Sequence, residues 1–185
     1  MKKIPTIFQR DWDNNPSRVL NIPNPACDWV FLGEGTATRK IDGTSCLVRK
    51  GLLFRRREIK PEQPIPGNFT REGTDPETGK LVGWVPVGDG PEDKYHRAAF
   101  AAAGELSEGT YELVGPNVQK NPEKLTQNVL IRHGQDIAGA LDDVPREFDA
   151  LAKWLKDHDV EGIVWHHPDG RMAKVKGRDF GISRT

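Results

Sequence analysis

The amino-acid sequence predicts an α+β domain built mainly on antiparallel sheet. Residues 45–55 form two strand-like runs around a tight turn at Gly51, which is typical of a β-hairpin. Residues 162–176 predict a second hairpin, whose turn lies at 167–170. Short strands of this kind, with only a few helices inserted between them, are typical of α+β folds.

Two helices accompany these strands. The Ala-rich run 93–103 predicts a helix that Asp93 caps. Residues 145–157 predict a second helix that begins at Pro145, a residue that suits a first helical turn. Its apolar side chains recur on one face: Phe148, Leu151 and Leu155.

The remaining segments divide into buried strands and an irregular region. Residues 110–114 and 128–132 are short apolar runs that predict strands. Residues 61–91 contain twelve glycines or prolines in thirty-one positions. This density predicts a functional loop or a mobile excursion with little regular structure.

Composition excludes several classes of protein. The 185 residues fit one domain, or at most one domain with a small appendage. They carry 27 basic and 27 acidic side chains, so net charge gives no simple reason to expect a nucleic-acid partner. The apolar runs are too short to span a membrane, and we expect no membrane partner. Two cysteines, Cys27 and Cys46, are too few for a disulfide framework. We expect reduced thiols in a monomeric cytoplasmic protein, or in the host cytoplasm if the chain is viral.

The segment 39–44, with the sequence Arg-Lys-Ile-Asp-Gly-Thr, is the first candidate for chemistry. Lys40 lies just before a predicted strand and two residues from the carboxylate of Asp42. A free lysine is protonated at pH 7, so a nucleophilic lysine needs neighbours that favour its neutral form. Because Asp-Gly is above all a turn signal, this string alone leaves both a turn and a nucleophile open.

Five strings in a fixed order resemble the motifs of the covalent nucleotidyltransferase superfamily, which contains ATP-dependent ligases and capping enzymes. These strings are residues 40–44, 54–57, 111–115, 160–164 and 173–176. A closer resemblance, to a stand-alone 5′-to-3′ RNA ligase family, covers most of the chain. It rests on residues 83–87, 111–117, 121–122, 130–134 and 161–166. DNA ligases and capping enzymes do not share the strings between the core motifs.

The resemblance implies a single nucleotidyltransferase domain over residues 1–185. Its fold would be an ATP-grasp-like ligase adenylation domain, in which antiparallel sheets flanked by helices hold ATP between them. Only nine residues follow Lys176, so we expect no C-terminal OB domain of the kind that DNA ligases and capping enzymes carry.

The resemblance also implies a three-step reaction. Lys40 would attack the α-phosphate of ATP and form a lysyl–AMP intermediate. The AMP would pass to an RNA 5′-phosphate, and an RNA 3′-hydroxyl would displace it to seal the strand. In-line displacements at phosphorus depend on positioning and charge neutralisation, so we expect Mg²⁺ or Mn²⁺ to assist.

Three further residues fit these needs. Lys174 and Lys176 are two apart on a predicted strand, so their side chains share a face and could grip one phosphate while favouring the neutral amine of Lys40. The alternative is a solvated alternating strand. By resemblance Glu161 helps to bind metal, whereas its alternative role is that of a turn residue between a helix and a strand.

Three more residues, Asp42, Gly43 and Glu112, are candidates for binding the nucleotide. By resemblance Asp42 and Gly43 bind the nucleotide together with Lys174 and Lys176. Glu112 lies inside an apolar strand, where a carboxylate needs a partner. The resemblance assigns it to the ribose, and the alternative is an exposed position on an edge strand.

The resemblance implies that one of three consecutive arginines, residues 55–57, contacts nucleotide or RNA phosphate. Strand alternation sends Arg55 and Arg57 to one face and Arg56 to the other, and we favour Arg56. Residues 49–60 form a basic band with six cations against one acid. Such a band could bind RNA phosphates with salt-dependent affinity.

The same residues are compatible with two other functions. A capping-type guanylyltransferase would use GTP, and a non-catalytic module would bind nucleotide or RNA ends without reacting. A DNA ligase is disfavoured because no OB domain is expected to encircle a duplex. The sequence does not identify the physiological RNA.

Overall fold

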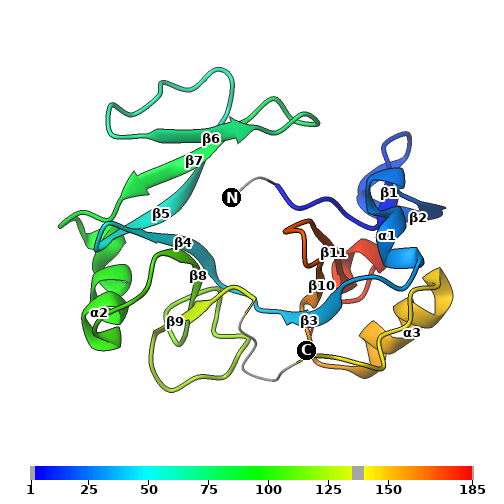
Figure 1. The fold of residues 1–185 in the computed structure, drawn as a ribbon. Coiled ribbons are helices and arrows are strands. Elements are labelled where there is room, and N and C mark those ends of the chain that lie inside the picture. The colour runs from blue at the N-terminus through cyan, green and yellow to red at the C-terminus, as the bar shows by residue number, and fades with distance from the viewer. Residues whose placement is uncertain (1–2, 135–139, 185) are drawn as a thin grey trace. The chain divides into compact units, whose positions relative to one another are not determined.

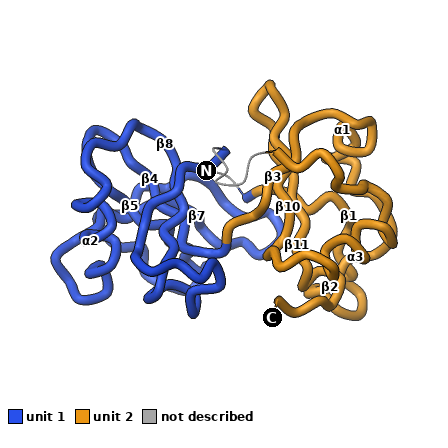
Figure 2. The backbone as a smooth tube through the Cα atoms, turned by 90° about the horizontal axis from the view of Figure 1, so that it is seen from below, with its two compact units in different colours: residues 1–3, 42–135 blue, residues 4–41, 136–185 orange. Residues whose placement is uncertain are grey.

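The computed structural model describes residues 3–134 and 140–184, and the chain divides into two compact units (Figures 1 and 2). Unit 1 comprises residues 1–3 and 42–135, and unit 2 comprises residues 4–41 and 136–185. Antiparallel sheets with a few short helices confirm the predicted α+β class. The chain passes from unit 2 to unit 1 directly after Ile41, inside the string that contains Lys40.

Unit 1 is built on a six-stranded antiparallel sheet with the strand order β6-β7-β5-β4-β8-β9. Its strands are β4 (Thr44–Arg49), β5 (Leu52–Ile59), β6 (Thr70–Thr74), β7 (Leu81–Pro86), β8 (Gly109–Val114) and β9 (Val129–Arg132). The hairpin β4–β5 confirms the predicted turn, because Lys50 and Gly51 have φ angles of 52° and 70°. Two positive φ angles are the geometry of a two-residue hairpin turn that matches the strand twist.

The two faces of this sheet carry different side chains. Alternation along β4 and β8 places Cys46 and Tyr111 in the cluster that packs against helix α2 (Lys94–Ala103). Ser45 and Glu112 are their neighbours along the strands and therefore lie on the opposite face, paired with each other in register. We call this opposite face, defined by Ser45, Arg56 and Glu112, the Glu112 face.

The glycine- and proline-rich segment 61–91 holds strands β6 and β7, so the prediction of little regular structure there is wrong. Trp84 and Val85 of β7 are buried. A Cβ atom at Gly83 would lie 2.2 Å from the Thr70 carbonyl oxygen. This glycine permits close pairing of β7 with β6, and composition alone does not distinguish that role from a turn.

Helix α2 follows the 3-10 turn η2 (Pro91–Asp93) and confirms the helix predicted at 93–103 except for its first residue. Asp93 makes no side-chain cap, contrary to the prediction. Its buried carboxylate instead accepts a hydrogen bond from the Gly88 N–H at 2.8 Å and pairs with Arg55 Nε at 2.7 Å. A buried carboxylate needs such partners, and these tie the loop before α2 to β5.

Unit 2 contains a three-stranded antiparallel sheet, ordered β11-β10-β3, and a two-stranded sheet, β1-β2. Its strands are β1 (Phe8–Asp11), β2 (Asn15–Pro23), β3 (Thr36–Lys40), β10 (Gly162–His166) and β11 (Met172–Lys176). Its helices are α1 (Asp28–Phe31) and α3 (Phe148–Asp157), with 3-10 turns η1 (Pro25–Cys27) and η3 (Gly177–Phe180). The β10–β11 hairpin confirms the prediction for residues 162–176.

Helix α3 begins at Phe148, so the predicted start at Pro145 is wrong. Glu147 has an extended backbone, with φ −75° and ψ 144°, and an extended residue cannot continue the helix towards the N-terminus. The predicted apolar face is confirmed, since Leu151 and Leu155 are buried and Phe148 packs against the same core. Other fully buried members of that core are Ile163, Trp165, Ala173 and Val175.

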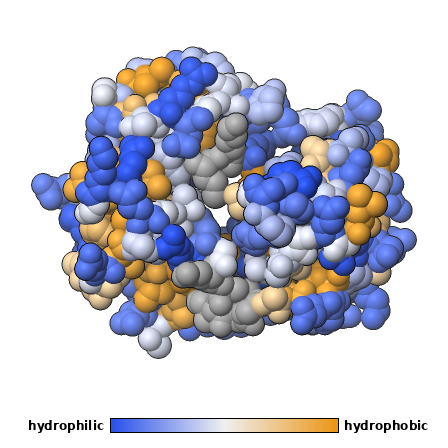
Figure 3. Space-filling view, in the orientation of Figure 1, coloured by the Kyte–Doolittle hydropathy of each residue, from blue (hydrophilic) through white to orange (hydrophobic). Residues whose placement is uncertain are grey.

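The molecular surface is mainly hydrophilic on the face that Figure 3 shows, with hydrophobic side chains in separate small patches. Among the described residues, the exposed large apolar side chains are those of Trp12, Leu20, Ile22, Leu32, Leu52 and Ile65. Scattered apolar side chains of this kind are common on protein surfaces. Among the helices of the described chain, none combines the length and hydrophobicity that a membrane span requires.

Both cysteines are buried free thiols, Cys27 in unit 2 and Cys46 in unit 1. Burial raises the pKa of Cys27 to about 11 and that of Cys46 to about 12. The thiolate is the reactive form of cysteine, so two thiols that stay protonated at pH 7 behave as core residues.

A buried histidine in unit 1 couples folding to pH. His96 of α2 is 9% exposed, and neither of its ring nitrogens has a hydrogen-bond partner among the described residues. Burial lowers the pKa of His96 from its ordinary value of 6.5; Asp93 opposes this shift and Arg55 reinforces it. The folded protein therefore favours the neutral ring.

We expect the free energy of unfolding to fall as the pH drops below about 6.5. In that range the unfolded chain binds a proton that folded His96 does not, with a slope of up to about 1.4 kcal/mol per pH unit until the folded-state pKa is passed. Urea midpoints of the wild type and of His96→Leu between about pH 5 and about pH 7.5 measure this. An equally steep fall in both proteins would show that His96 is not the group responsible.

Candidate functional site

Three strands of unit 2 bring two of the candidate lysines into one row. Gly162 of β10 is paired with Lys40 of β3 on one side and with Lys176 of β11 on the other. A Cβ atom at Gly162 would lie 2.1 Å from the Val175 carbonyl oxygen, so this close pairing needs glycine. The neighbouring residue Ile163 points into the core, and the row therefore lies on the opposite side of the sheet. We call this side, which carries Lys40, Lys174 and Lys176, the lysine face.

Glu161 stands directly before this row and binds both lysines. Its Oε2 lies 2.5 Å from Lys40 Nζ, and its Oε1 lies 2.5 Å from Lys176 Nζ. The three side chains are only 14–21% exposed. Although burial opposes the charged form, Lys40 and Lys176 lower the pKa of Glu161 below its ordinary range. Burial, followed by the charge of Lys40, lowers the pKa of Lys176.

Lys174 lies on the lysine face, two residues before Lys176, so the predicted sharing of one face is confirmed. Its backbone is paired with the N-terminal segment, because its N–H donates to the Pro5 carbonyl and its carbonyl accepts from the Ile7 N–H, both at 2.9 Å. Burial, and then the charges of Lys176 and Lys40, lower the pKa of Lys174 to about 8. Three crowded, partly desolvated amines favour an anionic ligand, which would offset their mutual repulsion.

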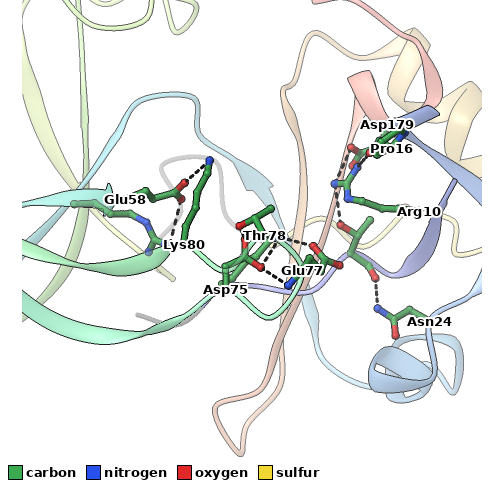
Figure 4. Close-up of polar contacts among 12 residues, drawn as sticks. Arg10, Pro16, Asn24, Glu58, Asp75, Glu77, Thr78, Lys80 and Asp179 are labelled. Carbon is green, nitrogen blue, oxygen red and sulfur yellow. Dashed lines mark hydrogen bonds and ion pairs between the residues drawn. The ribbon is translucent and has the colours of Figure 1, made fainter. Parts of the chain in front are cut away.

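A buried ion pair holds the end of β11 in place. Asp179 of η3 is 1% exposed, and its Oδ2 accepts the Lys176 backbone N–H at 2.9 Å. Its Oδ1 pairs with Arg10 at 3.3 Å, and Arg10 also donates to the Pro16 carbonyl at 3.1 Å (Figure 4). Asp179 therefore connects the β1–β2 sheet to the strand end that carries Lys176.

Asp42 and Gly43, the next residues of the lysine string, begin the main segment of unit 1. The Asp42 N–H donates to Glu123 Oε1 at 3.2 Å. A Cβ atom at Gly43 would lie 2.2 Å from the Leu113 carbonyl oxygen and 2.6 Å from Val114 Cγ1. Close approach of the chain to β8, rather than a turn with positive φ, explains this glycine.

Glu112 is 8% exposed on β8, which lies between β4 and β9, so the alternative of an exposed position on an edge strand is wrong. The partner that a buried carboxylate requires is His133, whose Nε2 lies 2.9 Å from Glu112 Oε2. His133 directly follows β9. The sequence indicated the need for a partner but not its identity.

The alternation predicted for the three arginines of β5 is confirmed. Arg55 is paired with Cys46 in register and lies on the side of α2, and the exposed Arg57 lies on that side too. Arg56 lies on the Glu112 face. Its Nη2 is 3.9 Å from Glu58, whose carboxylate also pairs with Lys80 at 3.5 Å (Figure 4).

The candidate residues thus form two groups, one in each unit. Unit 2 brings together Lys40, Glu161, Lys174 and Lys176 on the lysine face. Unit 1 contains Asp42, Gly43, Arg56 and Glu112, of which the last two share the Glu112 face. Within residues 3–134 and 140–184, no group of three or more histidine, cysteine or acidic side chains is arranged to hold a metal ion.

Three residues of these groups were missed by the sequence prediction. Asp179 has a local signal, since an acid three residues after a strand end often binds the backbone N–H at the start of the following turn. The contacts of Arg10 and His133 have no local signal, because each residue meets a carboxylate that is distant in sequence.

The lysine face combines an amine, two further cations and a carboxylate within one sheet. A lysine amine can act as a nucleophile, and neighbouring ammonium groups stabilise charge that gathers on a transferring phosphoryl group. A single carboxylate between them can fix their positions or bind one side of a metal ion. The arrangement therefore fits nucleophilic chemistry on a polyanionic substrate.

Several known proteins with similar sequences are named RNA ligase 1. A family model described as RNA ligase 1 matches residues 92–184, which include Glu112, Glu161, Lys174 and Lys176. RNA ligase 1 of Danio rerio is 24% identical over 98% of this chain and 81% of the relative. RNA ligase 1 of Pongo abelii is 29% identical, and that of Mus musculus 27%, each over 57% of this chain. The chain spans 42% of the length of each of these last two relatives.

We expect Gly162→Ala to destabilise unit 2 by roughly 1–3 kcal/mol, because its Cβ would collide with the backbone of β11. Gly67→Ala is the matched control, since a Cβ there meets nothing within 4 Å. We expect it to change stability by no more than about 0.5 kcal/mol. Denaturant unfolding of both variants measures the difference, and equal stabilities would contradict the close pairing described for β10.

Proposed function

This chain belongs to the RNA ligase 1 family, and we propose that it is an ATP-dependent RNA ligase that joins a 5′-phosphate to a 3′-hydroxyl through a lysyl–AMP intermediate at Lys40. The observation that carries this proposal is the position of Glu161 between Lys40 and Lys176, with Lys174 on the same face. The matched family model supports RNA as the substrate class.

In the first step the neutral amine of Lys40 attacks the α-phosphate of ATP. A nitrogen–phosphorus bond forms, the bond between the α-phosphorus and its bridging oxygen breaks, the amine loses a proton, and pyrophosphate leaves. Negative charge gathers on the phosphoryl oxygens during this displacement. Lys174 and Lys176 lie on the same sheet face as Lys40 and are suited to neutralise that charge.

In the second step an oxygen of the RNA 5′-phosphate attacks the phosphorus of the lysyl–AMP, and Lys40 is the leaving group. In the third step the RNA 3′-hydroxyl attacks the 5′-phosphorus, and AMP leaves as the phosphodiester bond forms. Both steps are in-line displacements that require charge neutralisation, so Lys174 and Lys176 serve throughout.

The acid on the lysine face fits a role in metal binding. Magnesium usually keeps several waters and takes one or two protein carboxylates together with substrate phosphates, so a single acid suffices. Glu161 would hold Mg²⁺ or Mn²⁺, and the metal, when bound, neutralises phosphate charge. Before such binding the Glu161 carboxylate is shared by Lys40 and Lys176 and keeps both amines on the lysine face.

The unit 1 residues are proposed to bind the nucleotide. Glu112 has a carboxylate oxygen suited to a sugar hydroxyl, and Arg56 on the same face is suited to a phosphate. Asp42 and Gly43 follow Lys40 in the chain and lead into β4, where a backbone without a side chain at Gly43 allows close packing.

The RNA itself is proposed to contact exposed arginines of unit 1. Arg57 of β5 and Arg71 of β6 are both paired with Gly83 of β7, the strand between them. The two arginines therefore lie on either side of Gly83, in one row across the three strands. Both arginines are exposed, and the ring of Phe69 covers the position where a Gly83 Cβ would lie. Two cations beside an aromatic ring suit a single-stranded phosphate backbone.

Self-adenylylation tests the proposed nucleophile. After incubation with ATP and Mg²⁺ or Mn²⁺, we expect the intact protein to gain the mass of one AMP, and Lys40→Ala to abolish this gain. Lys153→Ala is the control, because Lys153 is an 81% exposed lysine of α3. Labelling by GTP alone would select a capping-type guanylyltransferase, and failure to label with any nucleotide would favour a non-catalytic binding module.

Salt-dependent binding tests the proposed RNA contact. We expect the Arg57→Ala, Arg71→Ala double variant to bind single-stranded RNA more weakly and to reduce the slope of log affinity against log salt by about 1.4, since each lost phosphate contact contributes about 0.7. Lys153→Ala with Lys156→Ala removes the same charge from α3 and should leave the slope unchanged. Equal slopes in both double variants would place the RNA elsewhere. Self-adenylylation should be unaffected in either.

A further inference from the structure

His133 is fixed to β8 by two separate contacts. Its backbone N–H donates to the Thr110 carbonyl at 3.0 Å, which continues the pairing beyond β9. Its ring Nε2 lies 2.9 Å from Glu112 Oε2, two residues further along β8. Backbone and ring are therefore both held by the same strand, and the ring has little freedom to turn away from the carboxylate.

The surroundings of the ring favour one arrangement of its protons. Nδ1 is buried and has no hydrogen-bond partner in the part of the chain that the structure describes. A proton on Nδ1 would be a buried donor without an acceptor, which is unfavourable. The tautomer that carries its proton on Nε2 avoids this, and Nε2–H then donates to Glu112. Glu112 is therefore the acceptor of this hydrogen bond.

The contact with His133 involves only one of the two carboxylate oxygens of Glu112. Oε2 accepts from His133, and within residues 3–134 and 140–184 no hydrogen bond is made by Oε1. Glu112 faces Ser45 in register, and Arg56 lies on the same face of the sheet, one residue after the partner of Cys46. One oxygen is therefore anchored by protein, while the other remains available on a face that also carries a cation.

We propose that His133 is a positioning residue that aims the free oxygen of Glu112 at a hydroxyl of the nucleotide sugar. It thereby makes the site select ribonucleotides over deoxyribonucleotides. This inference rests on the proposed function, because it concerns the nucleotide that reacts with Lys40. Without the ring, the Glu112 side chain gains rotamer freedom and loses part of its alignment, so the hydroxyl contact weakens. Binding of the base and phosphates does not depend on this pair.

The test compares self-adenylylation rates with ATP, 2′-deoxyATP and 3′-deoxyATP as functions of nucleotide concentration. We expect His133→Ala to lower the preference for ATP over at least one deoxy analogue by roughly tenfold, the value of one hydrogen bond to a charged group. Glutamine can return a donor near the Nε2 position, so His133→Gln should restore most of the preference. His158→Ala is the matched control, because His158 is an exposed histidine that stacks on Trp154.

A double variant separates positioning from general stability. If His133 acts through Glu112, combining His133→Ala with Glu112→Gln should lower the preference no further than Glu112→Gln alone. Unfolding midpoints measured in parallel identify variants that fail to fold, and His133→Gln then carries the test. An unchanged preference in folded His133 variants would overturn this inference alone. A wild-type protein that never labels would overturn the proposed function and this inference with it.

Discussion

The arrangement of unit 2 depends on one carboxylate that two lysines share. Glu161 binds Lys40 and Lys176 at 2.5 Å each, and without it these two amines would lose the carboxylate that pairs with them on a partly desolvated sheet face. The register of three strands makes this contact possible. Gly162 of β10 is paired with Lys40 at the end of β3 and with Lys176 at the end of β11, and its lack of a side chain allows this close pairing. Charge and backbone geometry therefore support the same local structure.

Unit 1 uses a similar principle on a different sheet. Glu112 is buried within the six-stranded sheet and is held by the ring of His133, so here one carboxylate has a single side-chain partner where Glu161 has two. In each unit the neighbouring strand positions point into an apolar cluster, and alternation leaves the charged groups on the opposite face. The two proposed roles, reaction at the lysine face and nucleotide recognition at the Glu112 face, both follow from this division of core and functional sides.

Local patterns carried most of what the sequence predicted correctly. The turn at Gly51 and the spacing of Lys174 and Lys176 depend on residues close in the chain, and so does the apolar face of α3. Strands β6 and β7 were missed because glycine also permits close strand packing, as Gly83 does. The side chain of Asp93 and the partner of Glu112 were not predictable, because each depends on a contact between segments far apart in sequence. The division into two units gives no local signal either.

The central claim is that Lys40, one of the two lysines that Glu161 binds, is the residue that becomes covalently modified. Peptide mapping by tandem mass spectrometry, after the protein has been incubated with ATP and a divalent metal, tests this most directly. The account predicts adenylate on the peptide that contains Lys40, with the modification localised to that side chain. Adenylate localised to Lys174, to Lys176 or to a lysine of unit 1 would contradict it.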